Sequence, residues 1–170
     1  KKLNKTADEI LDELNHDSGL LGLSGVSSDQ RDIEAAAKEG NHGAKLALET
    51  MSYSIAKYIA GMMCALPRVD AVVFTAGAGE NGSTLRRHIV KHLAVFGYEL
   101  DDEQNNRVVG RAGLDGVISV KDTPRIMSIR TNEELMIAEE TETVIKDIAA
   151  AKRKMAKTAE EAAKKEADEL

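Results

Sequence analysis

A glycine-rich turn that follows an apolar run is the part of the sequence best suited to binding a ligand. Residues 70–81 read DAVVFTAGAGEN, so a run of β-forming residues ends in Gly77, Ala78 and Gly79. A strand that leads through glycines into a helix brings backbone N–H groups close to a nucleotide. Gly77 and Gly79 would also permit a positive φ and a close approach of the backbone. The alternative that these residues leave open is a tight connection that binds nothing.

Two polar residues end this turn and narrow the choice of ligand. Glu80 would repel a phosphate, so its carboxylate fits a ribose hydroxyl or a structural cap better. Asn81 is placed to cap the helix that follows, in competition with Ser83.

A second candidate site lies at residues 27–32, SSDQRD, where a helix is predicted to begin. Arg31 suits a nucleotide base or phosphate, and Asp29 suits a polar group of adenosine. Gln30 stands between them. The alternative is structural, with a serine that caps the helix and a surface ion pair between Asp29 and Arg31.

A third candidate is the segment 131–135, TNEEL, which follows a second predicted strand. Thr131 and Glu134 have the spacing of a capping box, which gives one glutamate a structural role. That spacing does not account for Glu133. A carboxylate at the carboxyl end of a parallel strand is well placed to hold Mg²⁺, directly or through water.

Strands and helices must alternate along the chain to position these three sites. Residues 69–75 and 125–130 have the composition of buried strands, and a helix is expected after each. This alternation predicts an α/β fold with parallel strands and right-handed crossovers. Residues 18–28 are expected to form a loop, because they hold three glycines and have no helical period. Further helices are expected over residues 6–15, 29–40, 44–66 and 83–96.

Composition excludes some classes of partner. The net charge of −6 argues against a nucleic-acid surface, which is normally basic. No apolar run approaches the roughly 20 residues that a membrane helix needs, and nothing at the start resembles a signal peptide. The single cysteine, Cys64, excludes an internal disulfide and is expected to pack as a small hydrophobe. A reducing, cytoplasmic setting is the natural expectation.

The composition changes near residue 147. Residues 149–170 are almost wholly Ala, Lys, Glu and Arg, which gives high helix propensity but little apolar face. We therefore expect residues 1–147 to form one nucleotide-binding portion and residues 148–170 to form a charged helical tail.

These three sites, in this order, resemble the acetate kinase family of carboxylate kinases. Residues 18–32, 70–81 and 131–138 carry the resemblance, and the connecting residues 39–48 and 97–106 agree with it. It covers residues 6–146 and is highly specific. The family shares its fold with actin, sugar kinases and Hsp70. The resemblance therefore implies a helix-rich α/β portion of an actin-like, RNase H-like ATPase domain with a small, mostly parallel sheet.

The resemblance also implies an activity and assigns residues to it. Family members transfer the γ-phosphoryl group of ATP to acetate, reversibly and with Mg²⁺, to give ADP and acetyl phosphate. By resemblance, Glu133 is associated with Mg²⁺, and the nucleotide-binding residues are Asp29, Gln30, Arg31, Gly77, Ala78, Gly79, Glu80 and Asn81. Ala78 stands where the family usually has isoleucine, so one wall of the adenine pocket is expected to be smaller. Family members pair through this domain, so a homodimer is expected.

Most of the catalytic machinery of the family is expected to lie outside this chain. The chain looks like the last third of such an enzyme, whereas the acetate pocket and the cations that hold the transferring phosphoryl group lie upstream. Phosphoryl transfer depends on such cations, so we expect this chain alone to be inactive. The alternative is a non-catalytic fragment that binds nucleotide or associates with another chain. Acetate, propionate and butyrate all remain open as the acyl acceptor.

Overall fold

The structure is a computed structural model that describes residues 5–109 and 115–168, with side chains through residue 156. The chain divides into two compact units, Lys1–Arg130 and Thr131–Leu170. Among the described residues, the first unit holds three strands and every helix but the last, and the second is built on a single helix.

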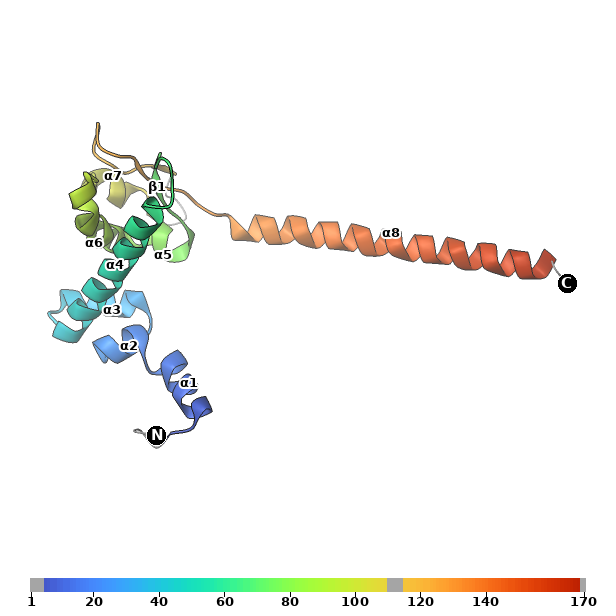
Figure 1. Cartoon of the computed structure of the whole chain (residues 1–170), viewed down its shortest axis with the longest axis horizontal. Coiled ribbons are helices and arrows are strands. Elements are labelled where there is room, and N and C mark those ends of the chain that lie inside the picture. The colour runs from blue at the N-terminus through green and yellow to red at the C-terminus, as the bar shows by residue number, and fades with distance from the viewer. Residues whose placement is uncertain (1–4, 110–114, 169–170) are drawn as a thin grey trace. The chain divides into compact units, whose positions relative to one another are not determined.

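A helical layer forms the first part of the first unit. The long helix α4 packs against α2 and α3 at one end and against α6 further along (Figure 1). Ile33 of α3 and Leu48 of α4 are buried in the small core between these helices, together with two alanines of α4. The bounds are α1 (Ala7–His16), α2 (Gly19–Ser24), α3 (Gln30–Lys38) and α4 (His42–Met63).

The prediction of a loop over residues 18–28 is wrong for its first half, which forms α2. Leu20 supplies the reason, because its side chain packs against the core made by α3 and α4. This tertiary contact outweighs the low helix propensity of the glycines. Gly25 then ends the helix in the left-handed conformation, with φ of 64°.

A three-stranded sheet lies in the second part of the first unit. Its strands are β1 (Val72–Phe74), β2 (Gly116–Val117) and β3 (Ile126–Ser128), in the order β1-β3-β2. β1 pairs parallel to β3, with Val72 opposite Ile126, and β2 pairs antiparallel to β3. Both predicted strands are therefore confirmed in shorter form, and their parallel pairing is confirmed as well.

The main core lies between this sheet and the helices on it. Ile89 and Leu93 of α6 are buried against Ile118 and Ile126 from the region of the sheet. Gly97 ends this helical stretch in the left-handed conformation, with φ of 81°. The remaining elements are α5 (Ala76–Asn81), α6 (Ser83–Leu93), the 3-10 turn η1 (Ala94–Phe96) and α7 (Asp102–Arg107).

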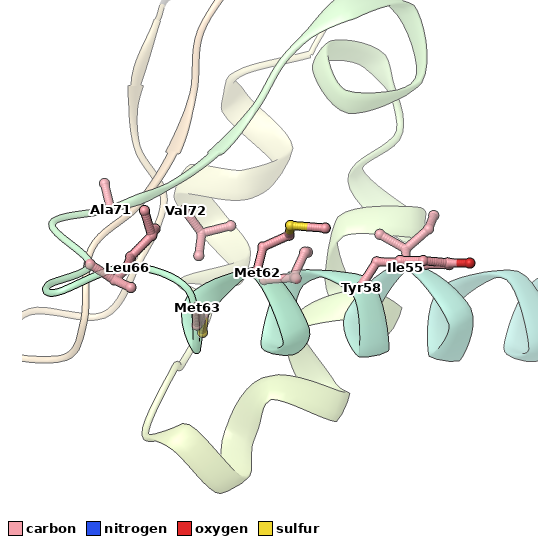
Figure 2. Close-up of a pocket in the computed structure, with 9 residues that line it drawn as sticks. Ile55, Tyr58, Met62, Met63, Leu66, Ala71 and Val72 are labelled. Atoms are coloured by element: carbon pink, nitrogen blue, oxygen red, sulfur yellow. The ribbon is translucent and has the colours of Figure 1, made fainter.

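The end of α4 departs from the expected buried face. Tyr58 is 72% exposed and Met62 is 65% exposed, and Cys64, expected to be packed, is exposed too. These side chains border an apolar groove of about 400 Å³ between the end of α4 and the segment that leads into β1. Figure 2 shows side chains from both segments facing this groove. Its lining consists of Ile55, Tyr58, Ile59, Met62, Met63, Leu66, Val69, Ala71 and Val72.

The second unit is the helix α8 (Glu133–Asp168). Its composition is acidic at the start and rich in Ala, Lys and Glu beyond residue 147, and the backbone stays helical through that change. Among the described residues, no helix combines the length and the apolar character that a bilayer-spanning segment requires.

Candidate functional site

Two of the three predicted sites meet at one cavity. A cavity of about 450 Å³ lies between the start of α3 and the segment formed by α5 and the residue after it. Its volume falls within the range of small-molecule sites. The lining residues are Asp29, Gln30, Arg31, Glu34, Gly77, Ala78, Asn81 and Gly82. Six of the eight residues predicted to bind nucleotide therefore lie around a single space.

The α3 wall is ordered by an ion pair within the first turn. Asp29, and not the expected serine, is the N-cap, and its carboxylate accepts the Arg31 backbone N–H at 2.8 Å. The Arg31 guanidinium donates to the same carboxylate through Nε at 3.0 Å and Nη2 at 2.5 Å. These hydrogen bonds lower the pKa of Asp29 to about 2, the guanidinium being the larger cause and the backbone N–H the second. The structural role of Asp29 in capping α3 therefore does not exclude a contact between its carboxylate and a ligand in the cavity.

The α5 wall is built almost without side chains. Gly77 and Gly79 lie within the helix and do not take a positive φ, so that expectation is wrong; Ala76, just before them, takes φ of 58°. At Gly79 the backbone packs closely on the end of β1, because a Cβ there would lie 3.2 Å from the carbonyl carbon of Phe74. A Cβ on Gly77 would meet no atom within 4 Å, because this residue faces the cavity.

Two lining residues were missed from the sequence. Glu34 lies one turn after Gln30 on α3 and accepts a hydrogen bond from its side-chain amide at 2.7 Å. Gly82 joins α5 to α6, and a Cβ there would lie 2.5 Å from the Ala78 carbonyl oxygen and 3.3 Å from Gln30 Nε2. The i,i+4 spacing of Gln30 and Glu34 is a signal that was available.

Gly79 and Glu80 do not line the cavity, although the prediction grouped them with its residues. Their carbonyl oxygens instead accept hydrogen bonds from the buried side chain of Arg86 on α6. Asn81 does line the cavity, and its side chain donates to the Gly77 carbonyl at 2.9 Å. The prediction that Asn81 caps α6 is therefore wrong. The N-cap of α6 is Gly82.

Glu133 lies at the start of α8, in the second unit, next to Glu134. Both side chains are exposed. Their carboxylate oxygens are the donor type that Mg²⁺ prefers, but an octahedral ion needs more ligands than they supply. No cluster of three or more His, Cys, Asp or Glu side chains suited to a metal occurs within residues 5–109 and 115–168. Glu133 therefore fits Mg²⁺ only together with ligands from water or a bound phosphate.

The chemistry of the cavity favours binding over catalysis. Arg31 is the one cation among its lining residues, and it is already paired with Asp29. Glu34 adds a second carboxylate to the lining. A polyphosphate would meet net negative charge here, whereas the hydroxyl and amino groups of a nucleoside would find carboxylate, amide and backbone partners.

Comparison with known proteins gives a consistent result. Residues 1–139 match the model of the acetokinase family. The chain is 50% identical over 141 residues to an acetate kinase of Lachnoclostridium phytofermentans and 49% identical over 137 residues to one of Deinococcus radiodurans. These matches cover 82% and 81% of this chain, but only 35% and 34% of the relatives. The chain thus spans about a third of the length of the curated relatives that it matches.

Solved structures agree with this result. A propionate kinase from Francisella tularensis superimposes with a TM-score of 0.73 at 40% identity, over 81% of this chain and 34% of that one. An acetate kinase from Porphyromonas gingivalis superimposes with a TM-score of 0.74 at 37% identity, over 85% of this chain and 36% of that one. The expected fold, a helix-rich α/β part of an actin-like ATPase domain, is confirmed, and the small sheet is mixed. The chain belongs to the acetokinase family.

Proposed function

We propose that this chain is the C-terminal part of an acetate kinase and that its cavity holds the adenosine part of ATP or ADP. The complete enzyme would convert ATP and acetate into ADP and acetyl phosphate in the cytoplasm. The observation that carries the proposal is the meeting of residues 29–31 with Gly77, Ala78 and Asn81 around one cavity. Segments so far apart in sequence have no local reason to share a polar cavity.

The roles of the residues follow from their chemistry. The Asp29 carboxylate and the Gln30 and Asn81 amides can exchange hydrogen bonds with ribose hydroxyls and with the edge of the base. The Arg31 guanidinium is held by Asp29 along one edge, through Nε and Nη2, which would leave its face available to stack on the base. Gly77 and Ala78 let the ligand approach the backbone of α5.

Glu133 would help to place Mg²⁺ in the complete enzyme. One carboxylate at a helix start binds this ion weakly, so the remaining ligands would be water and the phosphates of the nucleotide. The ion would neutralise charge on the phosphoryl group that is transferred.

We propose that this chain alone does not catalyse the reaction. Phosphoryl transfer needs several cations around the transferred group, and the one cation that lines the cavity is already paired. The other two thirds of a full-length relative would supply those cations. Within the described residues, β1 is at the edge of its sheet and runs beside the apolar groove (Figure 2). An upstream strand could add to this edge and cover the groove.

A second candidate is a fragment that binds nucleotide or pairs with another copy without catalysis. The exposed edge of β1 and the apolar groove favour self-association, so a homodimer is part of both candidates. The two candidates make different predictions about activity when the missing part is supplied.

The decisive experiment for binding is a calorimetric titration of the chain with ADP. We expect saturable binding that Gly77→Leu abolishes, because the new side chain would project into the cavity without a clash. Gly61→Leu is the matched control, since a Cβ on this exposed helical glycine of α4 also meets no atom within 4 Å. Equal binding by both variants, or no binding by the unaltered chain at millimolar ADP, would contradict the adenosine assignment.

The decisive experiment for activity is complementation. The chain is mixed with the upstream two thirds of the Lachnoclostridium phytofermentans relative, and acetyl phosphate formation from ATP and acetate is followed. We expect no product from either part alone and product from the mixture. Nucleotide binding without recovered activity would favour the non-catalytic fragment.

A further inference from the structure

A buried guanidinium holds one wall of the cavity from behind. Arg86 of α6 has no exposed surface. Its Nη1 donates to the carbonyl oxygens of Gly79, at 2.5 Å, and Glu80, at 2.8 Å. Both carbonyls belong to the last turn of α5, where backbone oxygens have no partner within the helix. The positive charge therefore stabilises the C-terminal end of α5 through direct contacts and through the helix dipole.

The other side of the same guanidinium is fixed by α7. Arg86 Nε donates to Asn105 Oδ1, and Nη2 donates to the Asn105 backbone oxygen, each at 2.7 Å. Asn105 is fully buried, and its Nδ2 donates to the Ser83 carbonyl oxygen at 2.9 Å. One side chain on α6 thus joins the ends of α5 and α7 through four hydrogen bonds.

This arrangement depends on the shape of arginine. Burial, and secondly the neighbouring Arg87, lowers the pKa of Arg86, yet a guanidinium keeps its charge in proteins. A buried cation needs a partner for each of its donors, because an unpaired charged donor is costly. A lysine ammonium at this position keeps the charge but cannot reach acceptors on both sides at once.

We propose that Arg86 is a positioning residue for nucleotide binding: it fixes the backbone of α5 so that Gly77 and Ala78 form a defined wall of the cavity. This inference rests on the proposed function of that cavity. The wall needs support from behind, because its own residues carry at most a methyl group. Arg86 lies outside the lining and touches no ligand there, so its effect is exerted through Gly79 and Glu80.

The test compares Arg86→Lys with Arg87→Lys in the full chain. Arg87 is the matched control because it is adjacent on α6 and pairs with Asp102 at the surface. We expect Arg86→Lys to weaken ADP binding by about tenfold, the loss of one or two charged hydrogen bonds. We expect Arg87→Lys to change it by less than about twofold. Both variants are titrated at a temperature where circular dichroism shows each of them to be folded. If Arg86 contributed only to the overall stability of the fold, the Kd of the folded variant would not change.

Hydrogen exchange tests independently whether Arg86 holds the backbone of α5. We expect amides of α5 to exchange faster in Arg86→Lys, while those of α4 keep their rates. If Arg86→Lys does not fold, Asn105→Ala replaces it. We then expect about threefold weaker ADP binding, because the guanidinium loses the Asn105 Oδ1 acceptor but keeps its three hydrogen bonds to backbone oxygens. An unchanged Kd and unchanged α5 exchange in the folded variant would overturn the inference. If the unaltered chain binds no ADP, the proposed function fails and the link to nucleotide binding fails with it; faster exchange in Arg86→Lys would then still show that Arg86 holds the backbone of α5.

Discussion

At the scale of single residues, Asp29 combines a structural role with a place in the lining of the cavity. Its carboxylate caps α3, pairs with Arg31 and still lines the cavity. An isolated carboxylate would change its charge near its ordinary pKa of 3.8. The hydrogen bonds from Arg31 keep it ionised to lower pH, so the wall of the cavity retains a charged acceptor even in acidic solution below pH 3.8.

The titration of Asp29 is a direct prediction of this geometry. A folded-state pKa of about 2, below the ordinary value, means that the contacts stabilise the fold above pH 3.8 and lose their effect as pH falls through 2. We expect an NMR titration of the Asp29 carboxyl carbon to show a midpoint near 2, and Arg31→Gln to raise it. Asp115, whose pKa Arg130 lowers, is the internal control and should not move in this variant. An Asp29 midpoint near 3.8 in the unaltered chain would contradict the structure.

Gly82 gives a prediction about packing. A Cβ at this position would lie 2.5 Å from the Ala78 carbonyl oxygen, a backbone atom that cannot move without shifting α5. We expect Gly82→Ala to lower the free energy of unfolding by about 1–3 kcal/mol in urea denaturation. Gly77→Ala is the control, and we expect it to raise the stability slightly, by up to about 1 kcal/mol, because its Cβ meets open space in a helix. A similar gain in both variants would show that backbone propensity and not the close contact decides the result.

Some residues of the site could be predicted from the sequence and others could not, and the difference has physical reasons. The glycine turn is recognisable because a strand, glycines and a helix follow one another locally. Arg86 is not recognisable, since a buried cation depends on carbonyl oxygens that only the tertiary fold brings together. Glu34 is an intermediate case. Its i,i+4 spacing from Gln30 could be read from the sequence, but its place in the lining of a cavity could not.

At the scale of elements, β1 and the end of α4 expose apolar surface together. The parallel pairing with β3 satisfies one side of β1, and its other side has no neighbouring strand within the described part of the chain. The periodicity of residues 44–66 predicted the helix but not that its last turns would be exposed. A pattern of apolar residues shows which face a helix buries, and it does not show what covers that face.

The exposed edge leads to a prediction about association. Val73 lies in the middle of β1 and is 47% exposed. We expect Val73→Lys to reduce self-association in sedimentation velocity runs, because a charged residue on an edge strand opposes strand pairing. Val95→Lys adds the same charge at an 83% exposed residue of η1, outside the strands, and should leave association unchanged. An unchanged sedimentation profile for Val73→Lys would exclude β1 from the interface.

At the scale of the whole molecule, the chain divides at residue 130 and not at the change of composition near residue 147. α8 crosses that change without a break because Ala, Lys and Glu all have high helix propensity. The assignment of residues 1–147 to one nucleotide-binding portion remains a prediction. The first unit has its own two cores, and both are built from residues before 130.

This division predicts the outcome of a truncation. A chain that ends at residue 147 keeps both cores, so we expect its thermal unfolding midpoint to stay within about 2 °C of that of the full chain. The helical signal at 222 nm should fall, because residues 148–168 are helical in the full chain. A fall of the midpoint by more than about 5 °C would show that the tail supports the first unit.

The methyl group of Ala78 has a practical consequence for chemical biology. An enlarged nucleotide base needs extra room in the pocket wall that it meets. Here a small residue already stands in the wall of a cavity of about 450 Å³. Under the proposed adenosine assignment, a complete enzyme with this wall should accept base-modified ATP analogues without engineering, and Ala78→Ile should remove that tolerance while leaving ATP itself as a substrate.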